Sequence, residues 1–297
     1  MVERRQRFAT RALARALTVT CTVGVAALGV LVTPRRAHAH PGWGIVRDAH
    51  GDVFYTDLVH VWRIDARGRK SIAVRDVHTH ELMLDSAGAL YGEDAEFLGG
   101  DRFRWRMWRR APDGRVSDVI PWRDGFRDEW GFVRGGDGAL YWASCVARGD
   151  GCVVKRRDAR GRVSVAAGGA RFGRPLNYLA AAPDGAVLVA DGPRVLRFVG
   201  DGRPTPVVGA VARDTGRFVL MGLQATPDGR VLIAAFSERA VVEIAPGGAR
   251  RVLARSEAPW HPTGVLAAPD GLWILEYDDG ARARVRHVSR GGASRTF

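Results

Sequence analysis

After residue 40 the chain repeats one pattern six times: an apolar run, a turn centred on glycine, and a second apolar run. Successive turn glycines are separated by 37, 50, 47, 44 and 42 residues. These six glycines are Gly51, Gly88, Gly138, Gly185, Gly229 and Gly271. A regular period in this range is typical of repeat proteins, in which each unit buries its faces against its neighbours.

The residues around each turn glycine predict two strands. The position six residues before the glycine is apolar in every unit: Ile45, Leu82, Phe132, Leu179, Leu223 and Val265. The runs after the glycine are rich in β-branched and aromatic residues, as strands buried on both faces require. A second glycine hairpin follows in each unit, at Gly68, Gly114, Gly161, Gly202, Gly248 and Gly292.

Four strands per unit and six units predict an all-β fold, a six-bladed β-propeller with four-stranded antiparallel blades. The predicted blades span about 41–76, 77–122, 123–170, 171–212, 213–256 and 257–297. A final strand near Ala293–Phe297 completes the last blade from its own sequence. We therefore expect the ring to close by packing of the first blade on the last, without strand exchange.

Residues 1–39 have the pattern of an export signal. Arginines are frequent in the first 15 residues, Ala16 to Val32 are uncharged and mostly apolar, and Ala37-His38-Ala39 provides a cleavage site. We expect cleavage before His40, a mature propeller of residues 40–297, and a periplasmic or extracellular location. The alternative is an uncleaved anchor, although this uncharged stretch of 17 residues is short for a span. After cleavage we expect no stable membrane insertion.

The charge pattern does not indicate a nucleic-acid partner. The formal net charge is +13, and removing residues 1–39, with seven Arg and one Glu, leaves +7. The remaining arginines are scattered through turns and outer strands and do not form the clustered stripe of a nucleic-acid footprint.

Cys145 and Cys152 bracket a short polar turn between apolar runs. In an oxidising compartment this spacing predicts a disulfide that clamps a hairpin. A metal-binding pair is the alternative, but no second Cys pair or C-terminal His pair accompanies it.

Three segments, residues 261–275, 175–191 and 220–235, resemble NHL-type repeats. Through them the chain is similar to the gluconolactonase and senescence-marker-protein group of propellers. The resemblance implies a site at one mouth of the central channel, where metal-binding Glu, Asn and Asp side chains stand about eight residues before the turn glycine. The residues at that position here are Trp43, His80, Trp130, Asn177, Met221 and Thr263. Only Asn177 matches the pattern, so the chain departs from the group where its metal would bind.

A different polar set is predicted at the same mouth. His80 and Glu81 are the candidate catalytic residues, because an imidazole and a carboxylate can act as general acid and base. The candidate ligands for one divalent metal ion in the channel are Asn177, His80, Glu81 and Glu129. The candidate ligand-binding residues are Trp43, His78, Trp130, Tyr178 and His261. Packing of the two tryptophans as a plug of the channel is the alternative to ligand contact.

The sequence thus supports two main functional hypotheses. The favoured one is an exported propeller that binds a small molecule, glycan or peptide at the channel mouth without catalysis. The alternative is a metal-dependent lactonase or esterase resembling gluconolactonase or paraoxonase. A propeller that holds a quinone cofactor is a third possibility.

Overall fold

The computed structural model describes residues 41–100, 102–125, 129–145, 151–173, 176, 178–213 and 218–297, with residues 129–131 described by their main chain alone. The predicted export signal and Asn177 lie outside the described residues. All the strands belong to one compact unit, His38–Phe297.

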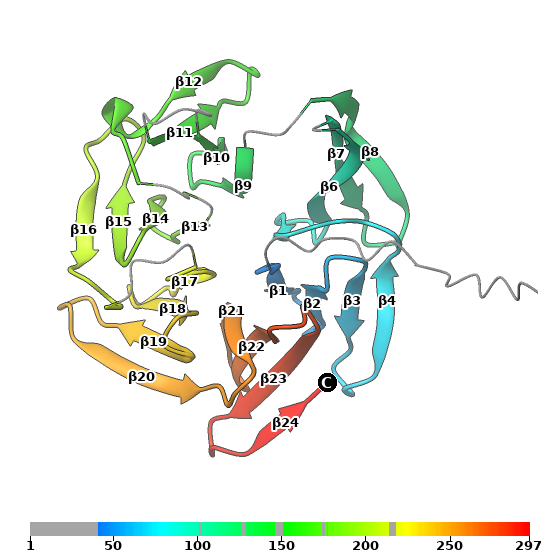
Figure 1. Cartoon of the computed structure of the whole chain (residues 1–297), viewed down its shortest axis with the longest axis vertical. Coiled ribbons are helices and arrows are strands. Elements are labelled where there is room, and N and C mark those ends of the chain that lie inside the picture. The colour runs from blue at the N-terminus through cyan, green and yellow to red at the C-terminus, as the bar shows by residue number, and fades with distance from the viewer. Residues whose placement is uncertain are drawn as a thin grey trace, which may run out of the picture. The chain divides into compact units, whose positions relative to one another are not determined.

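The described residues form six four-stranded antiparallel sheets arranged around a common axis (Figure 1). Within each sheet the strands follow in chain order from the axis outward. Blade one contains β1 (Ile45–Arg47), β2 (Val53–Thr56), β3 (Val61–Ile64) and β4 (Lys70–Val74). Blade two contains β5 (Met83–Leu84), β6 (Leu90–Gly99), β7 (Arg102–Arg110) and β8 (Val116–Asp124). Blade three contains β9 (Glu129–Arg134), β10 (Leu140–Cys145), β11 (Cys152–Arg157) and β12 (Val163–Val165).

The second half of the ring repeats this order. Blade four contains β13 (Leu179–Ala181), β14 (Val187–Asp191), β15 (Arg194–Phe198) and β16 (Thr205–Val208). Blade five contains β17 (Leu223–Ala225), β18 (Val231–Ala235), β19 (Ala240–Ile244) and β20 (Arg250–Arg255). Blade six contains β21 (His261–Ala268), β22 (Gly271–Tyr277), β23 (Ala283–Ser289) and β24 (Ser294–Thr296). The predicted six-bladed propeller is confirmed. In the described part of the chain the single helical element is a short 3₁₀ turn, Ala167–Gly169, and no helix there is long and apolar enough to cross a membrane.

The turn glycines have the conformation that the sequence pattern predicts. All six have positive φ, from 75° at Gly138 to 146° at Gly271, a region that only glycine adopts without a Cβ clash. In blade one, the Gly51 N–H donates to the Asp48 carbonyl at 3.1 Å, which closes the turn between β1 and β2. Each inner strand therefore ends at a tight turn on the same face of the ring, here called the glycine-turn face. The opposite face, where the inner strands begin, is called the His80 face.

Packing of blade one on blade six closes the ring, as expected. The last strand, β24, pairs with β23 of its own blade, and no strand is exchanged between the two described sheets. Leu275 and Tyr277 of β22 share a buried cluster with Val53 and Tyr55 of β2. The Tyr277 hydroxyl donates to the Thr56 carbonyl at 2.9 Å, which links blade six to blade one.

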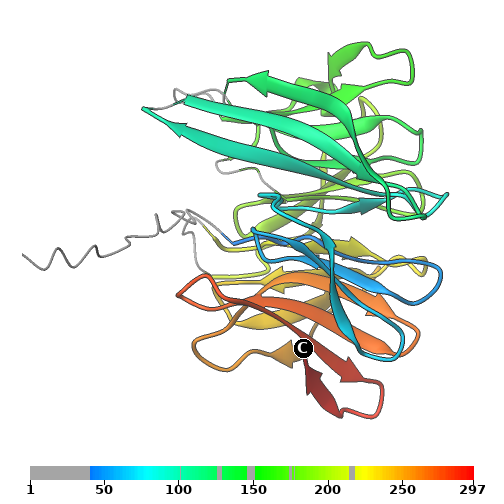
Figure 2. The ribbon, with the colours of Figure 1, turned by 90° about the vertical axis from the view of Figure 1, so that its right-hand side faces the viewer.

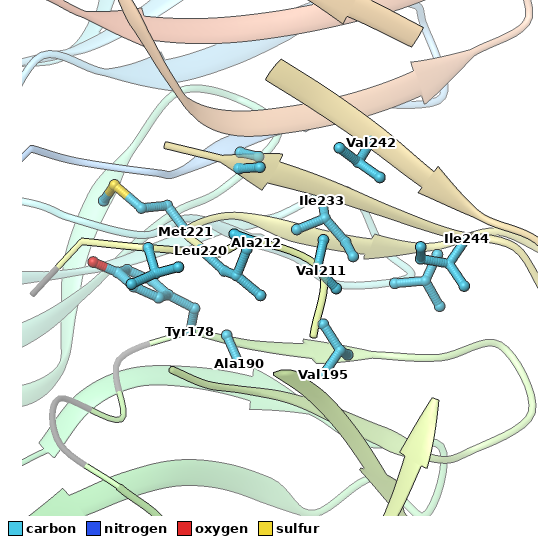
Figure 3. Close-up of a cluster of buried hydrophobic side chains, with 14 of the residues drawn as sticks. Tyr178, Ala190, Val195, Val211, Ala212, Leu220, Met221, Ile233, Val242 and Ile244 are labelled. Atoms are coloured by element: carbon cyan, nitrogen blue, oxygen red, sulfur yellow. The ribbon is translucent and has the colours of Figure 1, made fainter. Parts of the chain in front are cut away.

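The largest buried cluster lies between blades four and five (Figure 3). Val195 of β15 and Ala190 of β14 face Ile233 and Val242 of β18 and β19 across the gap between the two sheets. This cluster continues inward to Tyr178 and Met221 and reaches Trp43 of blade one. The hydrophobic contacts between blades therefore extend to the axis.

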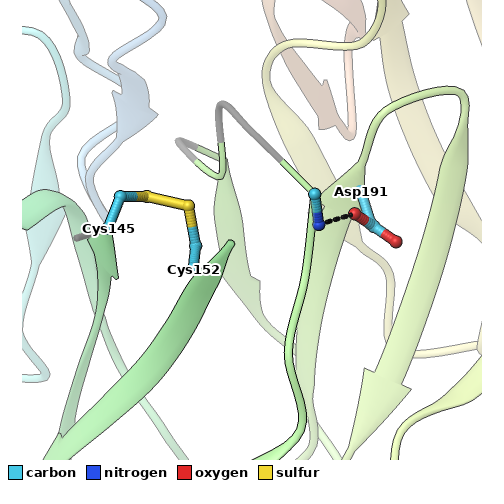
Figure 4. Close-up of a disulfide and its surroundings, with 4 residues drawn as sticks. Cys145, Cys152 and Asp191 are labelled. Atoms are coloured by element: carbon cyan, nitrogen blue, oxygen red, sulfur yellow. Dashed lines mark hydrogen bonds between the residues drawn. A yellow bond between two sulfur atoms is a disulfide. The ribbon is translucent and has the colours of Figure 1, made fainter. Parts of the chain in front are cut away.

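The predicted disulfide between Cys145 and Cys152 is confirmed (Figure 4). The two cysteines are direct cross-strand partners at the ends of β10 and β11. Cys152 also exchanges two main-chain hydrogen bonds with Phe172, both 2.9 Å long, in the segment that leads to blade four. The disulfide therefore stabilises a hairpin end that contacts the segment leading to the next blade.

Candidate functional site

The central channel contains a cavity of about 370 Å³. The cavity is lined by residues of all six inner strands or of the segments just before them. Most of these residues are apolar, such as Phe132, Leu179 and Leu223. Trp43 and Glu81 line the cavity near the His80 face, because they precede β1 and β5. Arg47 and Arg134, at the ends of β1 and β9, line it near the glycine-turn face. The cavity thus has apolar walls and charged residues near both ends.

His80 is fixed by Glu93, the residue at the middle of β6 in the same blade. The His80 main-chain N–H donates to Glu93 Oε1 at 2.6 Å, and His80 Nδ1 lies 2.9 Å from the same oxygen. Both side chains are buried. A carboxylate that engages Nδ1 fixes the orientation of the imidazole ring, with Nε2 as the ring nitrogen turned away from Glu93.

The main chain around His80 is held by a second set of buried groups. The Thr79 hydroxyl donates to the Glu93 carbonyl. The Trp108 indole N–H contacts the Thr79 hydroxyl at 3.1 Å and the Glu93 carbonyl at 3.0 Å. Thr56 of blade one donates through its hydroxyl to the Thr79 carbonyl at 2.5 Å. Because Trp108 and both threonines are fully buried, these bonds position the His80–Glu93 pair rigidly.

Two aromatic side chains from opposite sides of the ring meet beside His80. Trp43 of blade one stacks on the His80 ring with centroids 5.5 Å apart. Trp43 also contacts Tyr178, which lies just before β13 of blade four. The Trp43 and Tyr178 rings meet edge-on, with centroids 4.8 Å apart. Both are buried, as is Met221, which belongs to the same cluster. The cluster therefore crosses the channel axis, and Trp43 separates His80 from part of the cavity.

His78 belongs to the same group of residues. Its ring meets the His80 ring edge-on at 4.7 Å, and its Nδ1 lies 3.0 Å from the Leu58 carbonyl. The His78 main-chain N–H donates to Asp94 Oδ1 at 2.8 Å. Burial raises the pKa of Asp94, against the opposing effects of that hydrogen bond and of Arg106. Blade two therefore presents two imidazoles and the buried carboxylates of Glu81, Glu93 and Asp94 near the channel mouth.

His261, also predicted near the mouth, lies elsewhere on this face. It is the first residue of β21, its ring stacks on Phe236 of blade five at 4.3 Å, and its Nδ1 lies 3.0 Å from the Phe236 carbonyl. Its Nε2 lies 3.4 Å from Asp279 of blade six. In the described part of the molecule, these contacts are with blades five and six, and none joins His261 to the His80 cluster.

The described residues do not assemble a metal site. Among them, no group of three or more His, Cys, Asp or Glu side chains is placed to hold an ion. Trp43 and Met221, at the channel positions of blades one and five, offer no side-chain oxygen. Of the predicted metal ligands, Asn177 and the Glu129 side chain lie outside what the structure describes, as does the predicted ligand-binding side chain of Trp130.

Sequence reasoning did not identify Glu93, although the sequence contains a signal for it. Five residues after the turn glycine, the six blades carry Thr56, Glu93, Ala143, Ala190, Ala234 and Glu276. An acid in a buried strand is uncommon and needs a partner. Glu276 has two arginines, Arg284 at 2.7 Å and Arg286 at 2.9 Å, whereas Glu93 is bonded to His80. The partner therefore distinguishes Glu276, which arginines of its own blade hold, from Glu93, which orients His80.

The fold and this cluster define a six-bladed β-propeller with a polar group of residues at one mouth of its channel. No family model matches the chain, and no curated protein matches it by sequence. Among solved structures, the chain is similar to a putative gluconolactonase, with 19% identity, a TM-score of 0.56, and coverage of 81% of this chain and 86% of the other. The resemblance to gluconolactonase-like propellers is therefore confirmed for the fold.

Two further propellers are similar at the same level. One is the calcium-binding protein regucalcin from Agrobacterium tumefaciens, with 17% identity, a TM-score of 0.53, and coverage of 79% of this chain and 81% of the other. The second is a catalytically inactive histidine-to-alanine variant of virginiamycin B lyase from Staphylococcus aureus, crystallised with quinupristin. It is 12% identical, with a TM-score of 0.54 and coverage of 86% of this chain and 84% of the other.

Proposed function

We propose that this chain is an exported propeller that binds a small organic molecule in the channel, at the end lined by Trp43 and Glu81. The observation that carries the proposal is the buried His80–Glu93 pair, fixed by two contacts to one carboxylate oxygen, directly beside the residues that line the cavity. A cavity of about 370 Å³ accommodates a small molecule better than a glycan chain or a peptide. Its apolar walls and charged ends suit a ligand with an apolar body and a polar group.

Thermal unfolding in the presence of a defined compound panel tests this proposal. The panel contains monosaccharides, sugar lactones and aromatic carboxylic acids, and a ligand that binds the folded state raises the unfolding midpoint. We expect at least one class to raise it, and the shift to be lost in Glu81→Gln and in Trp43→Phe. Glu96→Gln, an exposed acid in β6 of the same blade, is the matched control and should retain the shift. A shift that survives both channel substitutions would place the ligand elsewhere and refute the proposal.

Hydrolysis of a lactone or ester is the second candidate function. The observation that favours it is the engagement of His80 Nδ1 by Glu93, because an imidazole held in this way can accept a proton at Nε2 from an attacking water. The fold is shared with a putative gluconolactonase and with a lyase whose histidine-to-alanine variant is inactive. Turnover of sugar lactones and aryl esters that is lost in His80→Gln would make the chain an enzyme. Absence of turnover together with ligand binding would leave the first proposal standing.

The second candidate function, hydrolysis of a lactone or ester, includes a divalent ion in the channel. It is supported by the fold shared with a calcium-binding propeller and by Glu81 at the channel position where four other blades have glycine. Elemental analysis of protein purified without chelator tests it directly. A stoichiometric ion that is lost in Asn177→Ala would support the metal-dependent hydrolase, and a metal-free protein would contradict it.

Export is supported by the disulfide and by the basic, apolar and small-residue order of residues 1–39. The proposal includes no nucleic-acid partner. In the described residues many arginines are paired with acids, as in Arg63–Asp52, Arg156–Asp137 and Arg230–Glu243. N-terminal sequencing of the exported protein, with His40 expected as its first residue, tests the cleavage site.

A further inference from the structure

The inner strands lie close together at the His80 face, where they begin. Three blades have glycine seven residues before the turn glycine, at Gly44, Gly222 and Gly264. A Cβ on Gly264 would lie 2.5 Å from the Trp43 carbonyl oxygen, and one on Gly222 would lie 2.8 Å from Gly264 Cα. A Cβ on Gly44 would lie 2.7 Å from the main-chain nitrogen of Leu82. The main chains of blades five, six, one and two therefore meet in succession at this face.

A hydrogen bond and buried side chains close the same end of the channel. The Gly44 N–H donates to the His80 carbonyl at 2.8 Å, which joins blade one to blade two. Trp43 extends across the axis to Tyr178 of blade four, and both belong with Met221 of blade five to one cluster of buried side chains. In the described part of the chain, contacts among five blades therefore close the channel at the His80 face.

The opposite end of the channel is open. In all six blades the described residues that line the cavity become more exposed toward the glycine-turn face. This face lies on the right in Figure 2, at the blue turn between β1 and β2. In blade one the change falls between Ile45, which is buried, and Val46, and in blade five it falls between Gly222 and Leu223. The cavity therefore opens to solvent at the glycine-turn face.

The side chains at the rim of this opening leave the entrance clear. Arg47 and Arg134 stand four residues before the turn glycines of blades one and three, and each folds back onto its own turn. Arg47 Nε donates to the Gly51 carbonyl at 3.2 Å, and Arg134 Nη1 donates to the Gly138 carbonyl at 2.8 Å. The equivalent residue of blade four is Ala181, whose side chain is a single methyl group. These hydrogen bonds hold the two guanidinium groups at the edge of the cavity.

We propose that the channel is a blind pocket, which its ligand enters from the glycine-turn face, on the side of the ring opposite to His80. The inference rests on the proposed function, since it concerns the same cavity, and it adds the entrance and the shape of the ligand. The step from Trp43 at the closed end to Arg47 at the rim spans about 13 Å, at about 3.3 Å per residue. A pocket of this depth and about 370 Å³, with mostly apolar walls, favours a slender aromatic or aliphatic molecule over a sugar ring.

Thiol labelling of the full chain tests the entrance without any ligand. Leu223→Cys and Met221→Cys place a thiol at two depths of blade five, and each variant is treated with N-ethylmaleimide. We expect the thiol at position 223 to react about tenfold faster or more, because position 221 lies at the closed end. Peptide mass spectrometry identifies the modified position, and circular dichroism confirms that each variant is folded. Equal rates, or faster reaction at position 221, would overturn the proposal.

Two isomers of one acid test the shape of the ligand. Biphenyl-4-carboxylate is linear and biphenyl-2-carboxylate is bent, and the two have the same atoms and charge. We expect the linear isomer to bind about tenfold more tightly or more, and therefore to raise the unfolding midpoint further at equal concentration. Equal binding of the two isomers, or no binding of the linear one, would contradict the inferred pocket.

A bulky label at the rim connects the entrance to ligand binding. Fluorescein maleimide on Ala181→Cys should abolish the midpoint shift that the linear isomer causes. The same label on Ala159→Cys, an exposed alanine in an outer turn of the same face, should leave the shift unchanged. A shift that is lost in Trp43→Phe and Glu81→Gln but retained by labelled Ala181→Cys would refute the entrance and leave the proposed function standing. The reverse result would refute the proposed function and support the entrance.

Discussion

Glu93 holds His80 through two contacts to one oxygen, although 13 residues separate them in the sequence. The main-chain N–H lies at 2.6 Å and the imidazole Nδ1 at 2.9 Å from this oxygen, and both residues are buried. The pair connects the segment before β5 to the middle of β6. The same contacts that orient the candidate functional imidazole therefore also stabilise blade two.

Glu93→Gln should reduce the free energy of unfolding by about 1–3 kcal/mol, because the buried N–H groups of His80 lose a charged acceptor. Chemical denaturation followed by tryptophan fluorescence measures the change. Glu96→Gln is the matched control, since Glu96 is in the same strand but its ion pair with Arg104 is exposed. This control should cost less than about 1 kcal/mol. Equal effects of the two substitutions would contradict a structural role for the His80–Glu93 contact.

Closure of the ring can be tested with two buried tyrosines. Tyr277→Phe removes the hydroxyl that donates to the Thr56 carbonyl across the junction of blades six and one. It should lower the free energy of unfolding by about 1–2 kcal/mol. Tyr55→Phe removes a buried hydroxyl that has no hydrogen-bond partner in the described structure, and should be neutral or slightly stabilising. Unfolding curves of the two variants should therefore separate. A larger loss in Tyr55→Phe would contradict this account.

The backbone of β6 approaches Trp108 too closely for any residue but glycine at position 92. A Cβ there would lie 2.3 Å from Trp108 Cζ2 and 2.9 Å from Thr79 Cγ2. Gly92→Ala should therefore cost about 1–3 kcal/mol through overpacking. Gly209→Ala, where nothing lies within 4 Å, should change stability by less than about 0.5 kcal/mol. Thermal unfolding of both variants measures the difference, and similar midpoints would show that the Trp108 region adapts easily.

Reduction of the disulfide should destabilise the native state by about 2–3 kcal/mol, on the basis of chain entropy for a closed loop of about eight residues. The measurement is the free energy of unfolding with and without a thiol reductant. A Cys145→Ala, Cys152→Ala variant should show the reduced value under both conditions. Because Cys152 also pairs with Phe172 through its main chain, the hairpin should remain folded in this variant. An unchanged stability on reduction would contradict the prediction.

Acid should destabilise the β3–β4 turn through Asp65. The hydrogen bond from the main-chain N–H of Arg69 is the main cause that lowers the pKa of Asp65, and the Arg69 side chain adds to it. A lowered pKa in the folded state means stability that is present above the unfolded value of about 3.9 and is lost as the pH falls through the folded value. Asp65→Asn keeps an acceptor but cannot gain a proton. Its unfolding free energy should therefore fall less steeply below pH 4 than that of the parent, and parallel curves would contradict this.

The fold could be predicted from the sequence because its determinants are local and repeated. A turn such as that at Gly51 needs a positive φ, and the apolar residues beside it need burial on both faces, so each unit specifies its own hairpin. The disulfide was predictable for the same reason, since Cys145 and Cys152 face each other across one hairpin. With six such units in one chain, a closed ring of blades is one of few arrangements that bury both faces of every sheet.

The arrangement of the candidate site was decided by the tertiary structure alone. His80 was recognisable as a polar residue before an inner strand, but its partner Glu93 lies on a different strand, and Trp43 meets Tyr178 across the channel from blade four. Such contacts depend on how far each side chain reaches once the ring has closed, and no local pattern encodes that distance. Local hydrogen bonding and burial thus determined the blades, whereas convergence about a common axis determined which residues of different blades touch.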